Sequence, residues 1–404
     1  MGREDPVMSG EAPTGPTEDP VPGFDDVTEQ DLRARGDLNW ARAPEGVLPS
    51  WVAEMDYAAC PAVLQAVGAA VRVGHFGYPS PAAVARLRSA TARFAERRLG
   101  WAVDPGLVVA TGDIMDGIRL ALTVLCEDGP VIVPTPAYPP FLEAVPLTGR
   151  AIVTLRLDPD AERATLDLDG IDAALAAGAR TVLLCNPHNP WGRSWSAAEL
   201  TGLRDVVVRH GARVVSDEVH APLVLPGGTH TPYAALEGTA DHVTTLLSAS
   251  KAFNLPGLKC AQIVAGSRAD ALALAALPIV ANHGMSPLGL EANIAAYDDG
   301  GPWLDTALAH LAGNRDLFAE QLTERLPKAR MRRLEATYLA WVDLRGYGHE
   351  NPAAVALQRG QVMVRAGTDF GPGGEGHVRA NLATSRDRVL DLVARLAEAV
   401  DPAD

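Results

Sequence analysis

Short apolar runs recur along the chain and are separated by longer stretches in which apolar residues return with helical spacing. Runs of this kind, bounded by turn residues, predict buried β-strands, and the stretches between them predict helices that pack on the sheet. A strand, loop, helix, strand order is typical of an α/β fold with a mostly parallel sheet. The strands predicted for this part of the chain are 108–110, 131–133, 181–185, 213–216, 243–247 and 260–265.

Two of the predicted helices carry clear end signals. Ser80 precedes a proline and is an N-cap candidate, and Gly100 follows the last helical residue. Further along, Ser196 and Glu199 have the spacing of a capping box, and Gly211 ends that helix. The second helix therefore completes a strand, loop, helix, strand unit that ends near residue 217.

The C-terminal part shows a second group of strands. They are predicted at 338–343, 362–365 and 377–382, and a closing helix follows at about 385–400. A chain of 404 residues with 47% apolar composition is long enough for a large core and for one large and one small domain.

Composition and charge exclude several classes of protein. The chain has no apolar run long enough to span a membrane, and a net charge of −15 argues against a nucleic-acid partner. Four scattered cysteines without a CxxC pair and ten histidines without an HExxH pair predict no disulfide and no metal site, and fit a cytoplasmic protein. The polar, acidic stretch 1–23 reads as a disordered tail and not as a signal peptide.

The most informative stretch is 248–259, which follows the apolar run 243–247 and contains Lys251 among small residues. A lysine held in a closed pocket loses part of its charge preference, and its neutral amine can form an imine with a carbonyl. Upstream, Asp217 stands at the end of another predicted strand, at the edge where open α/β sheets bind ligands. A lysine and an acid on two strand ends suit pyridoxal 5′-phosphate, because the acid keeps the pyridine nitrogen protonated and the ring becomes an electron sink.

These motifs resemble those of fold-type I pyridoxal-phosphate enzymes, and more narrowly the cystathionine β-lyase-like branch of the class I/II aminotransferase family, the MalY/PatB type of C–S lyase. The resemblance runs from about Phe24 to Val400. It implies an α/β fold with a mixed, mostly parallel seven-stranded sheet between helices and a smaller α+β domain. The implied divisions are a tail (1–23), an N-terminal segment that joins the small domain (24–59), a large cofactor-binding domain (60–290) and a small C-terminal domain (291–404).

The resemblance also implies roles around the cofactor ring. Lys251 would hold the aldehyde, Asp217 would bond the pyridine nitrogen and Tyr138 would stack on the ring. Asn189 would donate to the phenolate oxygen, and His220 would stand at the same edge.

A second set of residues is implied for the cofactor phosphate. The side chain of Asp113 would repel a phosphate unless it turned away or capped the helix, so its amide is expected to bind. The dimer partner would contribute the tyrosine of the turn 74–81. The implied phosphate and imine-orienting residues are Gly112, Asp113, Ile114, Ser248, Ser250, Lys259 and, across the interface, Tyr78.

Substrate contacts are implied at two places. Arg379 lies in a predicted strand, where an arginine is costly unless paired, and the family pairs it with the substrate α-carboxylate; a structural salt bridge is the alternative. The segment 48–57 would place backbone over the same carboxylate. Its implied contacts are Ala53, Glu54 and Tyr57, with Asn189 from the cofactor site, and Tyr57 would add a hydroxyl to the pocket wall.

These residues predict a C–S β-lyase that cleaves cystathionine or a cysteine S-conjugate to a thiol, pyruvate and ammonia. Alternatives are an aminotransferase, or an enzyme of specialised metabolism, as in lincosamide-type antibiotic pathways, that processes a bulky cysteine S-conjugate by elimination or by decarboxylation with oxidative deamination. A hypothesis of another class is a regulatory module that kept the fold and lost catalysis, against which both Lys251 and Asp217 argue. The expected partners are an amino-acid substrate and a second copy of the chain, with no nucleic acid and no membrane.

Overall fold

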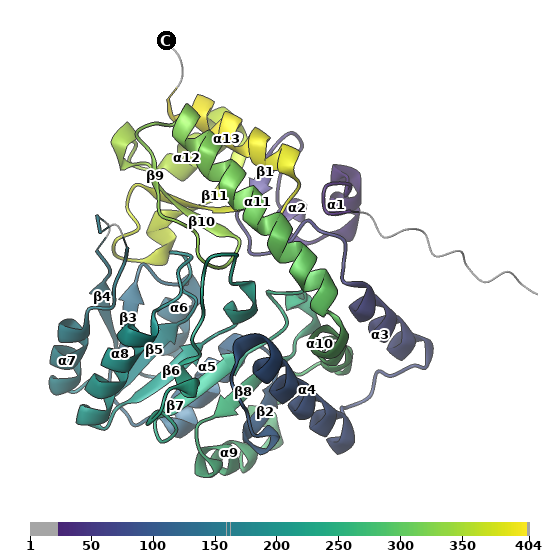
Figure 1. Cartoon of the computed structure of the whole chain (residues 1–404), viewed down its shortest axis with the longest axis vertical. Helices are drawn as coiled ribbons and strands as arrows, with labels where there is room; N and C mark the ends of the chain where they lie inside the picture. The colour runs from purple at the N-terminus through teal and green to yellow at the C-terminus, as the bar shows by residue number, and fades with distance from the viewer. Residues whose placement is uncertain (1–22, 159, 162, 402–404) are drawn as a thin grey trace, which may run out of the picture.

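The computed structural model describes residues 23–158, 160–161 and 163–401, so nearly all of the predicted tail 1–23 lies outside the described residues. The described chain forms two sheets, each covered by helices (Figure 1). The larger sheet has seven strands in the order β2-β8-β7-β6-β5-β3-β4, and its pairs are parallel except those that β8 makes with β2 and β7. The predicted mixed, mostly parallel seven-stranded sheet is confirmed.

The bounds of these strands agree with the apolar runs, with one omission. β4 was not predicted, because it is the edge strand and most of its residues are only partly buried. The strands are β2 (Val108–Thr111), β3 (Val131–Thr135), β4 (Ile152–Arg156), β5 (Thr181–Cys185), β6 (Arg213–Asp217), β7 (Val243–Leu247) and β8 (Ala261–Ala265).

Helices bury both faces of this sheet. On β5, Val182 and Leu184 belong to a core cluster on one face, whereas Leu183 and Cys185 belong to the cluster on the other. A strand buried on both faces needs apolar residues at every position, and this is why it appears in the sequence as a continuous apolar run. The helices that accompany the sheet are α3 (Pro61–Arg72), α4 (Pro81–Leu99), α5 (Ile114–Leu120), α6 (Pro139–Leu147), α7 (Leu168–Ala176), α8 (Ala197–His210), α9 (Arg268–Ala275) and α10 (Pro287–Asp299).

The helix end signals are confirmed. The Ser196 hydroxyl accepts from the amide of Glu199 at 3.3 Å, and the Glu199 carboxylate accepts from the amide of Ser196 at 2.9 Å, so α8 begins with a capping box. Gly100 and Gly211 end α4 and α8 in the left-handed conformation, which glycine adopts without a steric penalty.

The smaller sheet has five strands in the order β1-β11-β12-β10-β9. Its first strand comes from the N-terminal segment and pairs in parallel with β11, so chain ends far apart in sequence build one unit. The strands are β1 (Leu48–Ser50), β9 (Arg330–Met331), β10 (Leu339–Asp343), β11 (Val362–Ala366) and β12 (His377–Asn381), and the helices are α1 (Glu29–Arg35), α2 (Leu38–Ala41), α11 (Gly301–Arg325), α12 (Pro352–Gly360) and α13 (Arg386–Val400).

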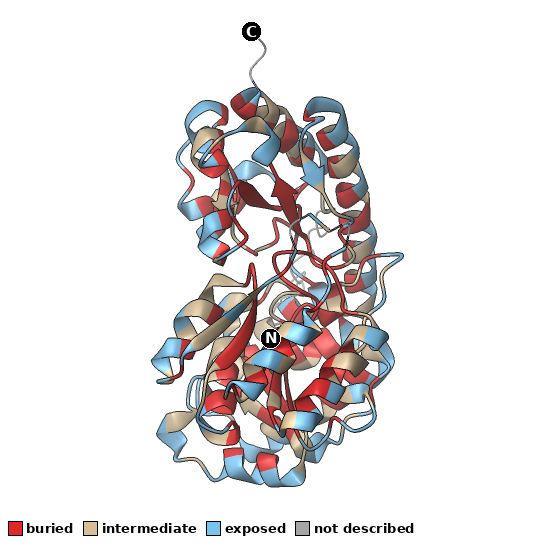
Figure 2. Ribbon diagram, turned by 90° about the vertical axis from the view of Figure 1, so that its left-hand side faces the viewer, coloured by how far each residue is buried: buried red, intermediate tan, exposed pale blue. Residues whose placement is uncertain are grey.

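Figure 2 shows buried residues along the strands of both sheets and exposed residues on the outer helix faces. Across the described ranges, no helix is both long and apolar enough to cross a membrane. Nor do the described residues include a group of three or more His, Cys, Asp or Glu side chains that could hold a metal ion.

Candidate active site

A cavity of about 170 Å³ lies where β5, β6 and β7 end and α5 begins, next to the segment that leads away from β1. Loops that leave parallel strands at their carboxyl ends meet at one edge of the sheet, and this geometry brings distant residues together. Eleven residues singled out from the sequence line the cavity: Ala53, Asp113, Ile114, Tyr138, Asn189, Asp217, His220, Ser248, Ser250, Lys251 and Lys259.

The amine of Lys251 points across the cavity to the N-terminal segment. Its Nζ donates to the carbonyl of Ala53 at 3.0 Å, and the hydroxyl of Tyr338 donates to the same carbonyl at 3.1 Å. The pKa of Lys251 is lowered to about 8, because burial and the charge of Arg379 outweigh the opposing charges of Glu54 and Asp217. A substantial neutral fraction near neutral pH makes this amine a nucleophile and a base.

Asp217 ends β6 and is almost fully buried. Its Oδ1 accepts from the amide of Val219 at 3.1 Å. The pKa of Asp217 is raised to about 7, because burial and the charge of Glu218 outweigh the amide of Val219 and the charge of Lys251. A protonated ring nitrogen would stabilise the ionised form of this carboxyl, because the ion pair compensates the buried negative charge.

Glu218 forms a buried network behind Asp217 that sequence reasoning did not single out. It is completely buried, accepts from Ser216 Oγ at 2.8 Å and from the amide of Tyr233 at 3.0 Å, and contacts Nε2 of His230 at 3.0 Å. This network holds the end of β6, and its charge raises the pKa of Asp217.

The predicted role of Asp113 agrees with its geometry. Its Oδ1 accepts from the amide of Asp116 at 2.9 Å and caps α5, so the side chain is used inside the protein. Its Oδ2 accepts from Lys259 Nζ at 2.8 Å. The point charge expected of Lys259 is therefore shared with Asp113, a pairing that the sequence did not predict. Because Asp113 already accepts from the amide of Asp116, only the other amides at the start of α5 remain for an anion.

Three further residues were expected near the phosphate. Gly112 packs so closely against Gly284 that a Cβ atom would lie 3.0 Å from the Gly284 carbonyl carbon. The Ser248 hydroxyl donates to the carbonyl of Cys260 at 2.8 Å and accepts from the amide of Ser250 at 3.0 Å, so it shapes the turn. Within the described residues the hydroxyl of Ser250 makes no hydrogen bond, which leaves it for a ligand.

The remaining ring contacts line the same cavity. Tyr138 precedes α6 and lies edge-on to Phe141, with ring centroids 5.5 Å apart. Burial lowers the pKa of His220 to about 3, so the imidazole is neutral, and its Nδ1 is buried without a hydrogen-bond partner among the described residues. Asn189 uses its Oδ1 to accept from Arg379, so its amide nitrogen is the part that can donate.

Arg379 lies in the middle of β12 and is 5% exposed. Its Nη1 donates to Oδ1 of Asn189 at 3.1 Å and its Nη2 donates to the carbonyl of Trp51 at 2.9 Å. No carboxylate pairs with it in the part of the chain that the structure describes, so the alternative of a structural salt bridge finds no support there. Burial lowers the pKa of Arg379 to about 10. A buried cation without a counter-ion is costly, and a ligand carboxylate would remove that cost.

Besides Gly112 and Arg379, three predicted residues are absent from the lining of this cavity. Tyr57 is 1% exposed and stacks on Phe24 with ring centroids 4.5 Å apart, so the predicted hydroxyl at the pocket wall is wrong: the ring is held in the core. The Glu54 carboxylate accepts from the amide of Asn39 at 2.9 Å, and acts on Lys251 through its charge only. Tyr78 is 84% exposed, so a role at the partner's cofactor stays a prediction.

Some lining residues were missed because nothing in the sequence marks them. They are small or apolar side chains that close the cavity without offering charge, and their position depends on which strand ends meet. They are Met115, Cys185, Val219, Pro256 and Cys260.

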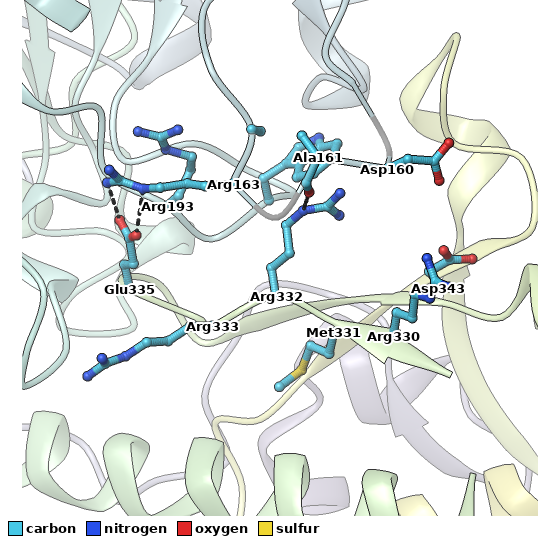
Figure 3. Close-up of a pocket in the computed structure, with 12 residues that line it drawn as sticks. Asp160, Ala161, Arg163, Arg193, Arg330, Met331, Arg332, Arg333, Glu335 and Asp343 are labelled. Atoms are coloured by element: carbon cyan, nitrogen blue, oxygen red, sulfur yellow. Dashed lines mark hydrogen bonds and ion pairs between the residues drawn. The ribbon is translucent and has the colours of Figure 1, made fainter. Parts of the chain in front are cut away.

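A larger cavity of about 690 Å³ lies between β9 and the segment that follows β4, and contains none of the predicted site residues (Figure 3). Its carboxylates are already paired. Glu335 accepts from Arg163 at 3.1 Å, and Arg345 Nη2 donates to both Asp160 and Asp343 at 2.7 Å. This cavity therefore offers arginine side chains and carboxylates that are already paired, not a base or nucleophile.

The cavity around Lys251 fits the cofactor expected from the sequence. It combines a low-pKa amine, a buried acid for a ring nitrogen, an aromatic ring and helix amides for a phosphate. The unpartnered Nδ1 of His220 is a further polar atom that a ligand would have to accommodate.

Comparison with known proteins agrees with this geometry. Residues 52–396 match the family model "Aminotransferase class I and II". The cystathionine beta-lyase of Corynebacterium glutamicum is 39% identical over 371 residues, which cover 91% of this chain and 98% of that protein. Cystathionine beta-lyase PatB of Bacillus subtilis is 34% identical and covers 87% of this chain and 92% of its own length. The PLP-bound C–S lyase of Staphylococcus hominis, 27% identical, superposes with a TM-score of 0.85 over 94% of this chain and 98% of its own.

Proposed function

Because the chain belongs to the class I and II aminotransferase family, we propose that it is a C–S β-lyase that uses pyridoxal 5′-phosphate. In the proposed reaction, cystathionine or another cysteine S-conjugate reacts with water to give a thiol, pyruvate and ammonia. The observation that carries the proposal is that one cavity brings together Lys251 with its low pKa and the buried acid Asp217. Through Asn189 the cavity also adjoins the guanidinium of Arg379, which no carboxylate of the described residues neutralises. The relatives named cystathionine beta-lyase support the same choice of reaction.

The proposed cofactor would be held by residues of known position. Lys251 would bind its aldehyde, Asp217 its ring nitrogen, and the amides at the start of α5 with Ser250 its phosphate. When bound, this cofactor supplies an electrophilic aldehyde and a ring that withdraws electrons from the substrate α-carbon. The solved C–S lyase of Staphylococcus hominis carries the same cofactor.

Arg379 would fix the substrate by its α-carboxylate. Its two terminal nitrogens already donate to Asn189 and to the carbonyl of Trp51, which holds the guanidinium plane in one orientation before substrate arrives. A charge-assisted contact with a carboxylate is worth roughly 1.5 to 3 kcal/mol. The positioned carboxylate leaves the α-carbon near Lys251.

Lys251 would then act on the α-proton. A pKa of about 8 leaves roughly one tenth of the amine neutral at pH 7, and this neutral amine is basic enough to take a proton. The carbonyl of Ala53 accepts from Nζ and gives the amine a defined resting place. Loss of the thiol from the β-carbon completes the elimination.

An aminotransferase is the second candidate, because the family name covers that reaction and the same lysine, acid and arginine serve it. The experiment that separates the two mixes cofactor-loaded protein with cystathionine and a panel of cysteine S-conjugates in the absence of any keto acid. Thiol and pyruvate in equal, catalytic amounts support the lyase. One equivalent of keto acid per enzyme without thiol means an aminotransferase, and carbon dioxide with an aldehyde and hydrogen peroxide means the decarboxylating reaction of specialised, antibiotic-type pathways.

The assembly, the domain division and the location belong to the same proposal. A homodimer in which Tyr78 reaches the partner's cofactor is consistent with the exposure of this side chain, 84% in one chain. The large domain 60–290 and the small domain 291–404, with 24–59 joined to the latter, follow the two sheets. The scattered buried cysteines suit a cytoplasmic location.

A further inference from the structure

Arg365 of β11 lies directly opposite Arg379 of β12 in the antiparallel register. Directly opposed residues of an antiparallel pair have neighbouring Cβ atoms and point to the same face of the sheet. Arg379 reaches Asn189, which lines the cavity around Lys251, so this face of the small sheet looks toward that cavity. The side chain of Arg365 therefore starts beside the proposed α-carboxylate anchor.

Only one of the two guanidinium groups has a carboxylate partner among the described residues. Arg365 Nε pairs with Asp369 Oδ2 at 2.6 Å, whereas Arg379 has no acid partner among the described residues. Like charges directly opposite each other on a sheet are destabilising. A pair of arginines kept in this position is therefore suited to a ligand that brings negative charge.

Arg365 has donors to spare and access to solvent. Its side chain is 35% exposed, whereas the residue Arg379 is 5% exposed. Arg379 is therefore buried, and Arg365 lies beside it closer to the solvent. The ion pair with Asp369 occupies Nε and orients the planar fork, and in the described residues its terminal nitrogens make no hydrogen bond. Those nitrogens can bind a carboxylate with two parallel hydrogen bonds.

The positive charge of Arg365 acts on the pKa values of two residues at the proposed active site. Burial lowers the pKa of Arg379, and the charge of Arg365 lowers it further. Burial raises the pKa of Tyr138, and the charges of Arg379 and Arg365 both oppose that rise. The positive charge of Arg365 thus acts on Arg379, the proposed α-carboxylate anchor, and on Tyr138, the aromatic residue that lines the cavity.

We propose that Arg365 is a specificity residue that binds an anionic group at the far end of the substrate's sulfur substituent, while Arg379 holds the α-carboxylate. The inference rests on the proposed lyase function and narrows its substrates to cysteine S-conjugates whose substituent ends in a carboxylate. Substrates with uncharged substituents are processed less efficiently, because they offer no negative charge to the terminal nitrogens of Arg365.

The test compares two substrates of the same size and shape on the cofactor-loaded enzyme. They are S-(2-carboxyethyl)-L-cysteine and its uncharged amide, S-(2-carbamoylethyl)-L-cysteine, and thiol release gives kcat/KM for each. The wild-type enzyme prefers the acid about tenfold, the size expected of a charge-assisted contact. Arg365→Gln abolishes the preference by lowering kcat/KM for the acid alone, and Arg365→Lys keeps part of it, because lysine retains the charge but not the fork.

The matched control is Arg395→Gln. Arg395 belongs to the same small unit, forms the same kind of ion pair four residues apart with Asp391, at 2.9 Å, and is 32% exposed, so its loss mimics any general effect of removing such an arginine. An acid-to-amide preference that Arg365→Gln leaves unchanged, or that Arg395→Gln removes equally, overturns the inference. Absence of thiol from both substrates in the wild-type enzyme overturns the proposed lyase function instead, so the two failures are distinguishable.

Discussion

Arg379 donates from Nη1 to Oδ1 of Asn189 at 3.1 Å, and this contact ties the middle of β12 to the loop that follows β5. The two residues are far apart in sequence: Arg379 belongs to the smaller sheet, and Asn189 to a loop that follows a strand of the larger sheet. Their contact fixes the guanidinium beside the cavity while no described carboxylate neutralises it. The consequences for activity and stability follow from this arrangement.

Arg379→Gln is expected to lower kcat/KM by about 10- to 100-fold, which corresponds to the roughly 1.5 to 3 kcal/mol of a charge-assisted contact. The change is mainly an increase in KM, because Arg379 would bind the carboxylate in the ground state as well as in the transition state. The variant should unfold at a temperature no lower than the wild type, since it removes a buried charge that lacks a counter-ion. A large fall in melting temperature would mean that the guanidinium is a structural element.

Lys251→Ala is expected to abolish thiol release and covalent retention of the cofactor. Borohydride treatment of the holoenzyme, followed by mass spectrometry of the denatured chain, should show the added cofactor mass in the wild type and none in the variant. Lys259→Ala is the control, because its amine pairs with Asp113 and should not bond the aldehyde. Labelling of Lys251→Ala would contradict the assignment.

Capture of the cofactor by apoprotein is expected to accelerate with pH up to about 8 and then level off. The attacking species is the neutral amine, and Lys251 with a pKa of about 8 is mostly protonated below that value. The measurement is the second-order rate of the absorbance change on mixing at constant ionic strength. A rate still rising steeply at pH 10 would indicate an ordinary, solvated lysine.

Asp217 is expected to make the apoprotein less stable as the pH rises. Its folded pKa of about 7 lies above the ordinary value of 3.8, so the stability it contributes is fully present below about pH 4 and is lost as the pH rises through 7. Asp217→Asn removes this dependence, and its stability relative to the wild type should increase between pH 4 and pH 8 by an amount on the order of a few kcal/mol. Urea unfolding of both apoproteins at the two pH values measures it; a constant difference contradicts the prediction.

Gly289→Ala is expected to destabilise the protein by about 1 to 3 kcal/mol, the usual cost of overpacking a close contact. A Cβ atom at Gly289 would lie 1.9 Å from the carbonyl oxygen of Leu258, so the turn that leads to Lys259 must move. Gly301→Ala is the matched control at the start of α11, where a Cβ atom meets nothing within 4 Å. Equal melting temperatures for the two variants would refute the steric argument.

The sequence alone was enough to identify the strands of the large sheet other than β4 and the capped helices α4 and α8. It also singled out Lys251 and Asp217, which the structure places at one cavity. These features are local: a strand buried on both faces must be apolar throughout, and a helix end must satisfy its own amides. The position of a residue at a strand end can therefore be predicted from the neighbouring sequence alone.

Other features depended on contacts between distant segments. The sequence did not show that Tyr57 turns into the core against Phe24, that Lys259 pairs with Asp113, or that Arg365 lies opposite Arg379. A side chain's burial, partner and pKa are set by whichever groups the fold brings within a few ångströms, and those groups lie tens to hundreds of residues away in the chain. The sequence determined which side chains with suitable chemistry are present. The tertiary structure decided their charge states and which of their atoms are left without a protein partner and can bind a ligand.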